Sequence, residues 1–109
     1  MPASGYRVMW LFAMFDLPVE TKAHRREYAQ FRKKLLGAGF TMLQYSVYAK
    51  HLPSEEAAES LRAGVRAALP PHGQVRLVAI TDHQFGKMDV FYGRKRRRVE
   101  PAPMQIAMF

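Results

Sequence analysis

Cysteine is absent from this chain of 109 residues. Its absence excludes disulfide scaffolds, thiolate nucleophiles, iron–sulfur clusters and thiolate zinc sites. No apolar run approaches the roughly 18 residues that a membrane-spanning helix needs, and the opening Met-Pro-Ala-Ser-Gly lacks the basic start of a secretory signal. We therefore expect a soluble, intracellular protein.

Familiar catalytic and ligand-binding spacings are also missing. No His-x3-His, His-Glu-x-x-His or Gly-x4-Gly-Lys pattern occurs, which leaves zinc and P-loop nucleotide sites without support. No serine lies in a Gly-rich elbow, and no motif of the RNA-recognition fold indicates base stacking on a sheet. The histidines are scattered, and we expect none of them to be a ligand or catalyst, with the first bordering a helix–sheet interface; they are His24, His51, His72 and His83.

Acidic residues are few relative to basic ones: nine Asp and Glu face 17 Lys and Arg, a formal net charge of +8. An excess of this size is typical of proteins that bind a polyanion such as nucleic acid, although a small domain also tolerates it for solubility alone. The charge is uneven, because five units lie in the unbroken run Arg94–Arg98. Without that run, 12 Lys and Arg against nine Asp and Glu leave +3.

The chain is long enough for one domain with a single two-layer core. Residues 6–15 are nearly all apolar and predict a central strand buried on both faces. Residues 40–51 must be extended, either as one bent strand or as two strands divided near 44–46. Two further strands are expected at 74–81 and 89–92.

Two amphipathic helices are expected, at residues 19–36 and 54–69. Gly37 ends the first, and Ser54 is the N-cap of the second. Each helix has one apolar stripe that should pack on the sheet; the stripes comprise His24, Tyr28, Phe31 and Leu35, and Ala58, Leu61, Val65 and Leu69.

This order of elements predicts an α+β, ferredoxin-like βαββαβ sandwich, an antiparallel sheet with two helices on one face. The opposite face then has nothing in the chain to cover it, which predicts a homodimer through the sheets. We expect a ferredoxin-like domain over 1–93, a basic run and Pro-containing linker over 94–103, and an extra C-terminal strand at 104–109 that pairs with a sheet edge of its own or of a partner.

Asp16 is the carboxylate best placed for chemistry, because it ends a buried strand just before a helix. Magnesium usually takes one or two protein carboxylates together with waters and substrate phosphates, so a second Asp16 across a two-fold axis would complete a site. The alternative is an N-cap for the following helix. Asp82, the other carboxylate after a strand, is better explained as a turn former or salt-bridge partner.

Three segments in this order resemble the CRISPR-associated Cas2 family, in the form that accompanies type II systems. They are Met14–Pro18, Leu43–Tyr48 and Ile80–Phe85, and the likeness runs from about Arg7 to Gly93 with a similar Phe-ending tail beyond. The resemblance implies a homodimer in the prokaryotic cytoplasm that bridges two integrase dimers and holds duplex DNA during spacer acquisition.

The resemblance also implies roles for individual residues. The family's metal-binding aspartate falls on Asp16, which makes it the candidate catalytic residue of a nuclease dependent on Mg²⁺ or Mn²⁺ and acting on single-stranded RNA or on DNA. The tail corresponds to the segment that contacts the integrase, here Met104, Ile106, Met108 and Phe109. Contacts to the DNA backbone correspond to Lys22, Arg25, Arg26, Arg94, Lys95, Arg96, Arg97 and Arg98.

Three functions remain open at this stage. The first hypothesis is a scaffold of the integration complex that grips duplex DNA. The second is a metal-dependent endonuclease, and one protein could have both functions. The third hypothesis is a toxin-like, metal-dependent ribonuclease of the same small fold, for which the basic run is less expected.

Overall fold

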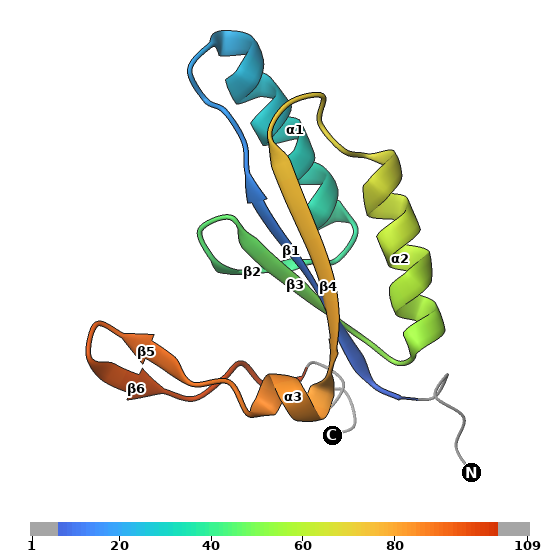
Figure 1. Cartoon of the computed structure of the whole chain (residues 1–109), viewed down its shortest axis with the longest axis vertical. Coiled ribbons are helices and arrows are strands. Elements are labelled where there is room, and N and C mark those ends of the chain that lie inside the picture. Colours follow the sequence, from blue (N-terminus) through green and yellow to red (C-terminus); the bar gives the residue numbers. More distant parts are fainter. Residues whose placement is uncertain (1–6, 103–109) are drawn as a thin grey trace.

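Strand β1 (Met9–Asp16) occupies the interior of a four-stranded sheet in the computed structural model, which describes residues 7–102. The other strands are β2 (Thr41–Gln44), β3 (Val47–Leu52) and β4 (Gln74–Thr81), and the order across the sheet is β2-β3-β1-β4. β1 pairs antiparallel with both β3 and β4. This is the predicted α+β, ferredoxin-like arrangement, with both long helices on one face (Figure 1).

The segment 40–51 forms two strands rather than one bent strand. A turn of two residues, Tyr45 and Ser46, joins β2 to β3, with Gln44 paired to Val47. Ser46 adopts a φ of 62°, the left-handed region that usually requires glycine. The sequence left this choice open because no Gly or Pro marks the turn.

The helices lie close to their expected positions. α1 spans Lys22–Gly37 and α2 spans Glu55–Ala67. The hydroxyl oxygen of Thr21 caps α1 by accepting from the His24 backbone amide, and Ser54 caps α2 in the same way. α1 therefore begins three residues later than the apolar pattern indicates, while the Ser54 cap is confirmed.

The main core lies between the sheet and these helices. Its buried members from the helices are Phe31, Leu35, Ala58 and Val65, as the predicted stripes require. Leu69 is an exception, because it lies beyond the end of α2 and is 45% exposed. From β1 the core takes the alternate side chains Met9, Leu11, Ala13 and Phe15.

The opposite sheet face is not bare, so one sequence expectation is wrong. A short helix, α3 (Asp82–Gly86), and the segment around Val99 and Ala102 cover part of it. The Phe85 ring stacks on Trp10 with a centroid separation of 3.8 Å. The sequence did not reveal this cover, because five residues of α3 are too few for a helical periodicity.

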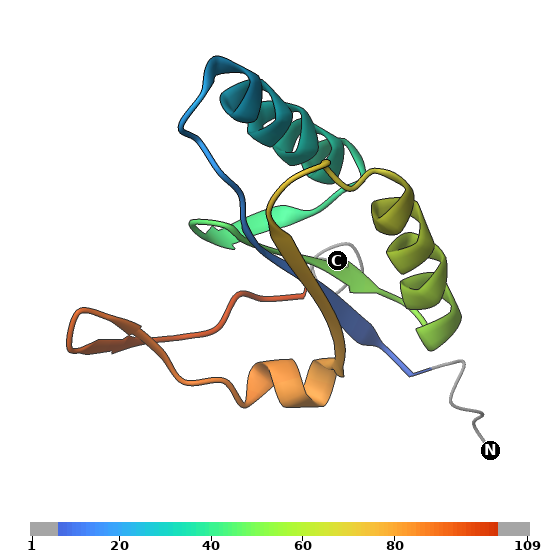
Figure 2. The same cartoon turned by 45° about the horizontal axis from the view of Figure 1, so that its top comes forward.

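A hairpin follows α3 and lies well apart from α1 and α2 (Figure 2). It pairs β5 (Val90–Tyr92) with β6 (Lys95–Arg97) in a separate two-stranded sheet. The basic run, expected as the start of a linker, is thus partly a strand. The predicted C-terminal strand at 104–109 lies outside the described residues.

Within residues 7–102, no helix has the length and apolar character required to cross a membrane.

Candidate functional site

Asp16 is the exposed last residue of β1, opposite Gln74 of β4. The backbone here is closely confined by the loop before β4. Gly73 has a φ of 92°, and a Cβ on it would lie 2.8 Å from the Asp16 carbonyl oxygen and 2.7 Å from Leu17. Only glycine fits at this position, so the structure fixes the strand end that carries the carboxylate.

The Asp16 carboxylate has no structural task in the described chain. It is not the N-cap of α1, because Thr21 fills that role five residues later. Among residues 7–102, no side-chain hydrogen bond or ion pair engages it. The alternative that explained Asp16 as a helix cap is therefore wrong.

The donor set around Asp16 suits a hard cation only in part. No three His, Asp or Glu residues gather into a metal-binding group anywhere between residues 7 and 102. The Asp16 carboxylate of one chain is a single ligand, which is enough for magnesium only if phosphates, waters or a second subunit complete the shell.

The basic residues early in α1 follow directly after this strand end. Lys22, Arg25 and Arg26 are all exposed. Arg25 is partly committed, since its guanidinium donates to the backbone carbonyls of Val19 at 3.0 Å and Glu20 at 3.3 Å. It therefore holds the loop that leads from Asp16 to the helix.

The second basic group, residues 94–98, lies far from the start of α1. Residues 94–98 are exposed on the β5–β6 hairpin, at the opposite end of the long axis from the start of α1 (Figure 1). Arg96 pairs with Asp89 at 2.6 Å, and Arg97 lies over the Tyr92 ring, 5.2 Å from its centroid. One chain therefore does not bring the two predicted DNA-contacting groups together.

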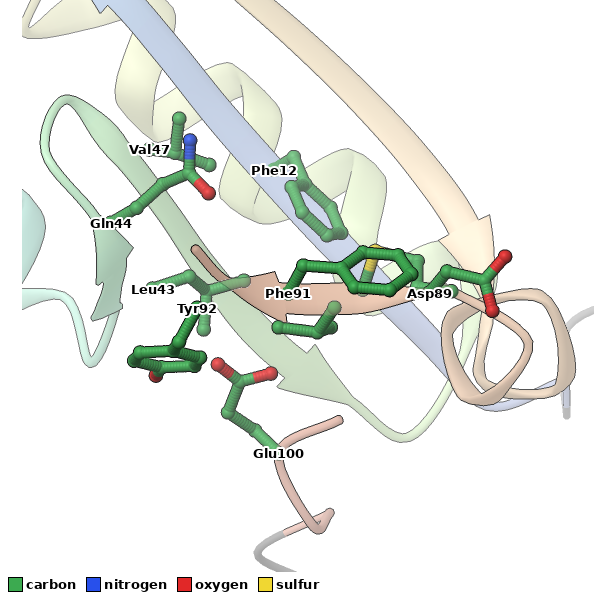
Figure 3. A pocket seen from close by; sticks show the side chains of 10 residues that line it. Phe12, Leu43, Gln44, Val47, Asp89, Phe91, Tyr92 and Glu100 are labelled. Carbon is green, nitrogen blue, oxygen red and sulfur yellow. The ribbon is translucent and has the colours of Figure 1, made fainter. Parts of the chain in front are cut away.

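A pocket of about 470 Å³ separates the hairpin from the sheet face opposite α1 and α2 (Figure 3). Phe91 and Tyr92 come from the hairpin, whereas Phe12, Leu43 and Val47 come from the sheet. Phe91 is 57% and Tyr92 63% exposed. Aromatic side chains so open to solvent make this face suitable for contact with another surface.

Asp82 has the structural role that the sequence favoured for it. Its carboxylate accepts from the Trp10 indole N–H at 2.7 Å and lies 3.7 Å from Nε2 of His51. The His51 side chain is only 6% exposed and meets Trp10 edge-on. The cluster of Asp82, Trp10 and His51 holds α3 against β1 and β3. Its members are far apart in the sequence, so no local pattern predicted it.

The remaining histidines near the start of α1 form carboxylate pairs. His24 lies 3.5 Å from Glu20 and His72 lies 3.2 Å from Glu27, while the two imidazole rings meet at 5.3 Å. The sequence predicts His24 at a helix–sheet interface, whereas the ring contact that the structure gives it is with His72 in the loop before β4.

Tyr45 is a functional candidate that sequence reasoning missed. It is 75% exposed in the β2–β3 turn, beside the strand end that carries Asp16. The neighbouring Tyr28 phenol raises the pKa of Tyr45 above its ordinary value. A single strand over residues 40–51 gives no reason to expect the Tyr45 ring to point into solvent. The two-residue turn between β2 and β3 places the ring there.

Comparison with known proteins identifies the family to which this sequence is similar. The sequence model for "CRISPR associated protein Cas2" matches residues 9–88. A "CRISPR-associated endoribonuclease Cas2" of Parvibaculum lavamentivorans is 48% identical over 101 residues, which cover 93% of this chain and 100% of that protein. Proteins of the same description from Flavobacterium psychrophilum and Paracidovorax avenae are each 42% identical, covering 95% and 97% of this chain and 90% and 98% of their own.

Proposed function

Because the chain belongs to the CRISPR-associated Cas2 family, we propose that it is a spacer-acquisition subunit of a prokaryotic CRISPR system. In this role a homodimer binds duplex DNA and bridges integrase dimers. It also hydrolyses phosphodiester bonds of RNA or DNA through Asp16 of each subunit. The observation that carries the catalytic part is the Asp16 carboxylate itself, exposed at a rigid strand end without a structural partner among the described residues.

Asp16 would hold Mg²⁺ or Mn²⁺, since a carboxylate oxygen is the ligand these ions prefer. When bound, such an ion supplies charge stabilisation at the phosphate and an activated water. The protein's own contribution is to present Asp16 on a fixed backbone. Arg25 contributes by holding the following loop through two carbonyl oxygens.

Binding of the duplex rests on charge. The net charge of +8 becomes +16 in a dimer, and both basic groups are exposed. Each phosphate neutralised by Lys or Arg releases counterions, so such binding is strong at low salt and insensitive to sequence. Two chains would also offer two hairpins and two α1 starts to one duplex.

The homodimer is supported by the uncovered part of the sheet. β4 is an edge strand of eight residues, and no strand pairs with its outer edge within residues 7–102. Val78 on this strand is 42% exposed on the face opposite α1 and α2, and the pocket beside Phe91 and Tyr92 lies on that face too. An open edge next to apolar surface is a template for pairing with another chain.

Replacing Asp16 with Asn tests the catalytic part. We expect Asp16→Asn to lower Mg²⁺-dependent cleavage of single-stranded RNA and of duplex DNA by about two orders of magnitude or more, because Asp16 would hold the ion whose charge supplies several kcal/mol of transition-state stabilisation. The exposed position of Asp16 should leave thermal unfolding unchanged.

The matched control is Glu56→Gln, which removes one exposed carboxylate from α2. Spacer integration with the cognate integrase is measured in parallel. Undiminished cleavage by Asp16→Asn contradicts the catalytic assignment and leaves the scaffold role. Loss of integration with retained duplex binding shows instead that Asp16 serves more than cleavage.

A further inference from the structure

The β2–β3 turn presents an aromatic ring to solvent at the end of the sheet that carries Asp16. The Tyr45 side chain is 75% exposed, the largest exposure among the exposed apolar and aromatic side chains of residues 7–102. The turn is closely tied to the candidate site: the Phe15 amide, one residue before Asp16, donates to the Ser46 carbonyl oxygen at 3.1 Å.

The ring is held in place by a row of aromatic side chains. Tyr45 stacks on Tyr28 with centroids 6.3 Å apart and planes 21° apart. Tyr28 contacts Phe15 edge-on at 5.9 Å, and Phe15 stacks on the buried Tyr48 at 5.5 Å. One ring face of Tyr45 is thus supported from the core while the side chain remains open to solvent.

The turn itself is held in an unfavourable conformation. Ser46 has a φ of 62°, which an L residue with a side chain adopts only where the surroundings enforce it. Such positions concentrate at functional sites. Here the conformation is what closes a two-residue turn and places Tyr45 at its tip.

Two arginines of α1 lie beside Tyr28, the residue on which Tyr45 stacks. Arg25 and Arg32 lie three residues before and four residues after Tyr28, so they flank Tyr28 on the surface of α1. Both arginines are exposed. An ordinary tyrosine phenol is neutral near pH 7, so the ring adds no negative charge that would repel a phosphate.

We propose that Tyr45 is a base-stacking residue that positions an unpaired nucleotide of single-stranded nucleic acid beside Asp16, with the neighbouring phosphates on the arginines of α1. Every base has a π-face, and stacking on a fixed aromatic side chain is the usual means of binding single strands without sequence readout. The platform is a turn rather than a sheet surface, so it needs none of the motifs of the RNA-recognition fold. The inference rests on the proposed function, because it names the substrate form that the Asp16 site would receive.

The test compares Tyr45→Phe, which keeps the ring, with Tyr45→Leu, which keeps an apolar side chain without one. The probe is a single-stranded oligonucleotide with one fluorescent purine analogue whose emission is quenched on stacking. Binding is measured without divalent ions, so that no cleavage occurs. A closed circular duplex, which has neither unpaired bases nor ends, is the second ligand.

We expect Tyr45→Leu to weaken binding of the single strand about tenfold and to abolish the quenching. Tyr45→Phe should match the wild-type protein in both respects, and binding of the circular duplex should be the same for all three. Thermal unfolding checks that the exposed side chain is not needed for folding.

The proposal is overturned if Tyr45→Leu binds and quenches like the wild type, or if affinity for the circular duplex falls in parallel. It is also overturned if the wild-type protein binds the duplex but no single strand. Its failure is distinguishable from that of the proposed function. Stacking at Tyr45 together with undiminished cleavage by Asp16→Asn removes the catalytic role and keeps the stacking site.

Discussion

Asp16 and Asp82 occupy similar places in the sequence, each at the end of an apolar strand, yet the fold gives them opposite surroundings. Because β1 and β4 run antiparallel, the two carboxylates lie at opposite ends of that strand pair. Asp82 meets Trp10 and His51, whereas Asp16 meets no side-chain partner within residues 7–102. The sequence separated the two by their positions, and the antiparallel pairing of β1 and β4 gives the physical reason for their different surroundings.

The Trp10–Asp82 hydrogen bond supports a prediction at the same scale. We expect Trp10→Phe to lower the free energy of unfolding by about 2–3 kcal/mol, because the variant cannot make this part-buried bond to a charged group and a smaller ring fills the site. Urea unfolding of Trp10→Phe, Asp82→Ala and the double variant measures the coupling between the two side chains. Additive effects of the two substitutions would show that the hydrogen bond contributes nothing.

At the scale of elements, the basic run illustrates what a charge pattern omits. Five consecutive basic residues predict solvent exposure, and all five are exposed. The pattern did not predict that 95–97 would pair with 90–92, or that Asp89 would neutralise Arg96. The positive φ of Gly93 closes this hairpin, so its charges sit on a structured element rather than on a free linker.

The hairpin's share in duplex binding is measurable through salt. Replacing both Arg96 and Arg97 by Ala should flatten the slope of log K against log salt by about one unit for each DNA phosphate that these side chains neutralise. The control replaces Arg62 and Arg66 of α2 by Ala, which removes the same charge on the helix side of the sheet. An equal flattening in both double variants would mean that only net charge matters.

At the scale of the whole molecule, the far face of the sheet decides how much the single chain can do. α3 and Ala102 cover one part of this face, while Val78 and the hairpin aromatics remain open. The two basic groups lie at opposite ends of one chain, and one Asp16 is too few for a firm metal site. The proposed dimer would supply a second Asp16 and a second copy of each basic group.

A charge on the open face should disrupt that dimer. We expect Val78→Glu to weaken self-association at least tenfold in sedimentation equilibrium, since assembly through this face would bury an unpaired carboxylate from each subunit. Leu69→Glu, with a similarly exposed side chain beyond α2, is the control and should leave association unchanged. A monomeric wild-type protein, or a dimer indifferent to both variants, would argue against assembly through this face.

The sequence by itself determined the architecture and the principal candidate residue. Apolar runs and helical stripes are local signals, and their order admits little besides a ferredoxin-like sheet with two helices on one face. Position at a strand end identified Asp16, and the absence of cysteine and of histidine spacings narrowed the chemistry to carboxylates and basic residues.

Only the tertiary structure decided the features that depend on contacts between distant segments. It placed Thr21 rather than Asp16 at the start of α1, folded α3 onto Trp10, and closed a turn at Ser46 without glycine. That turn exposes Tyr45 on a support of rings drawn from two other elements. These features depend on packing between distant segments and on a strained backbone conformation that the rest of the fold enforces. Packing between distant segments and local backbone strain leave no periodic pattern in the sequence.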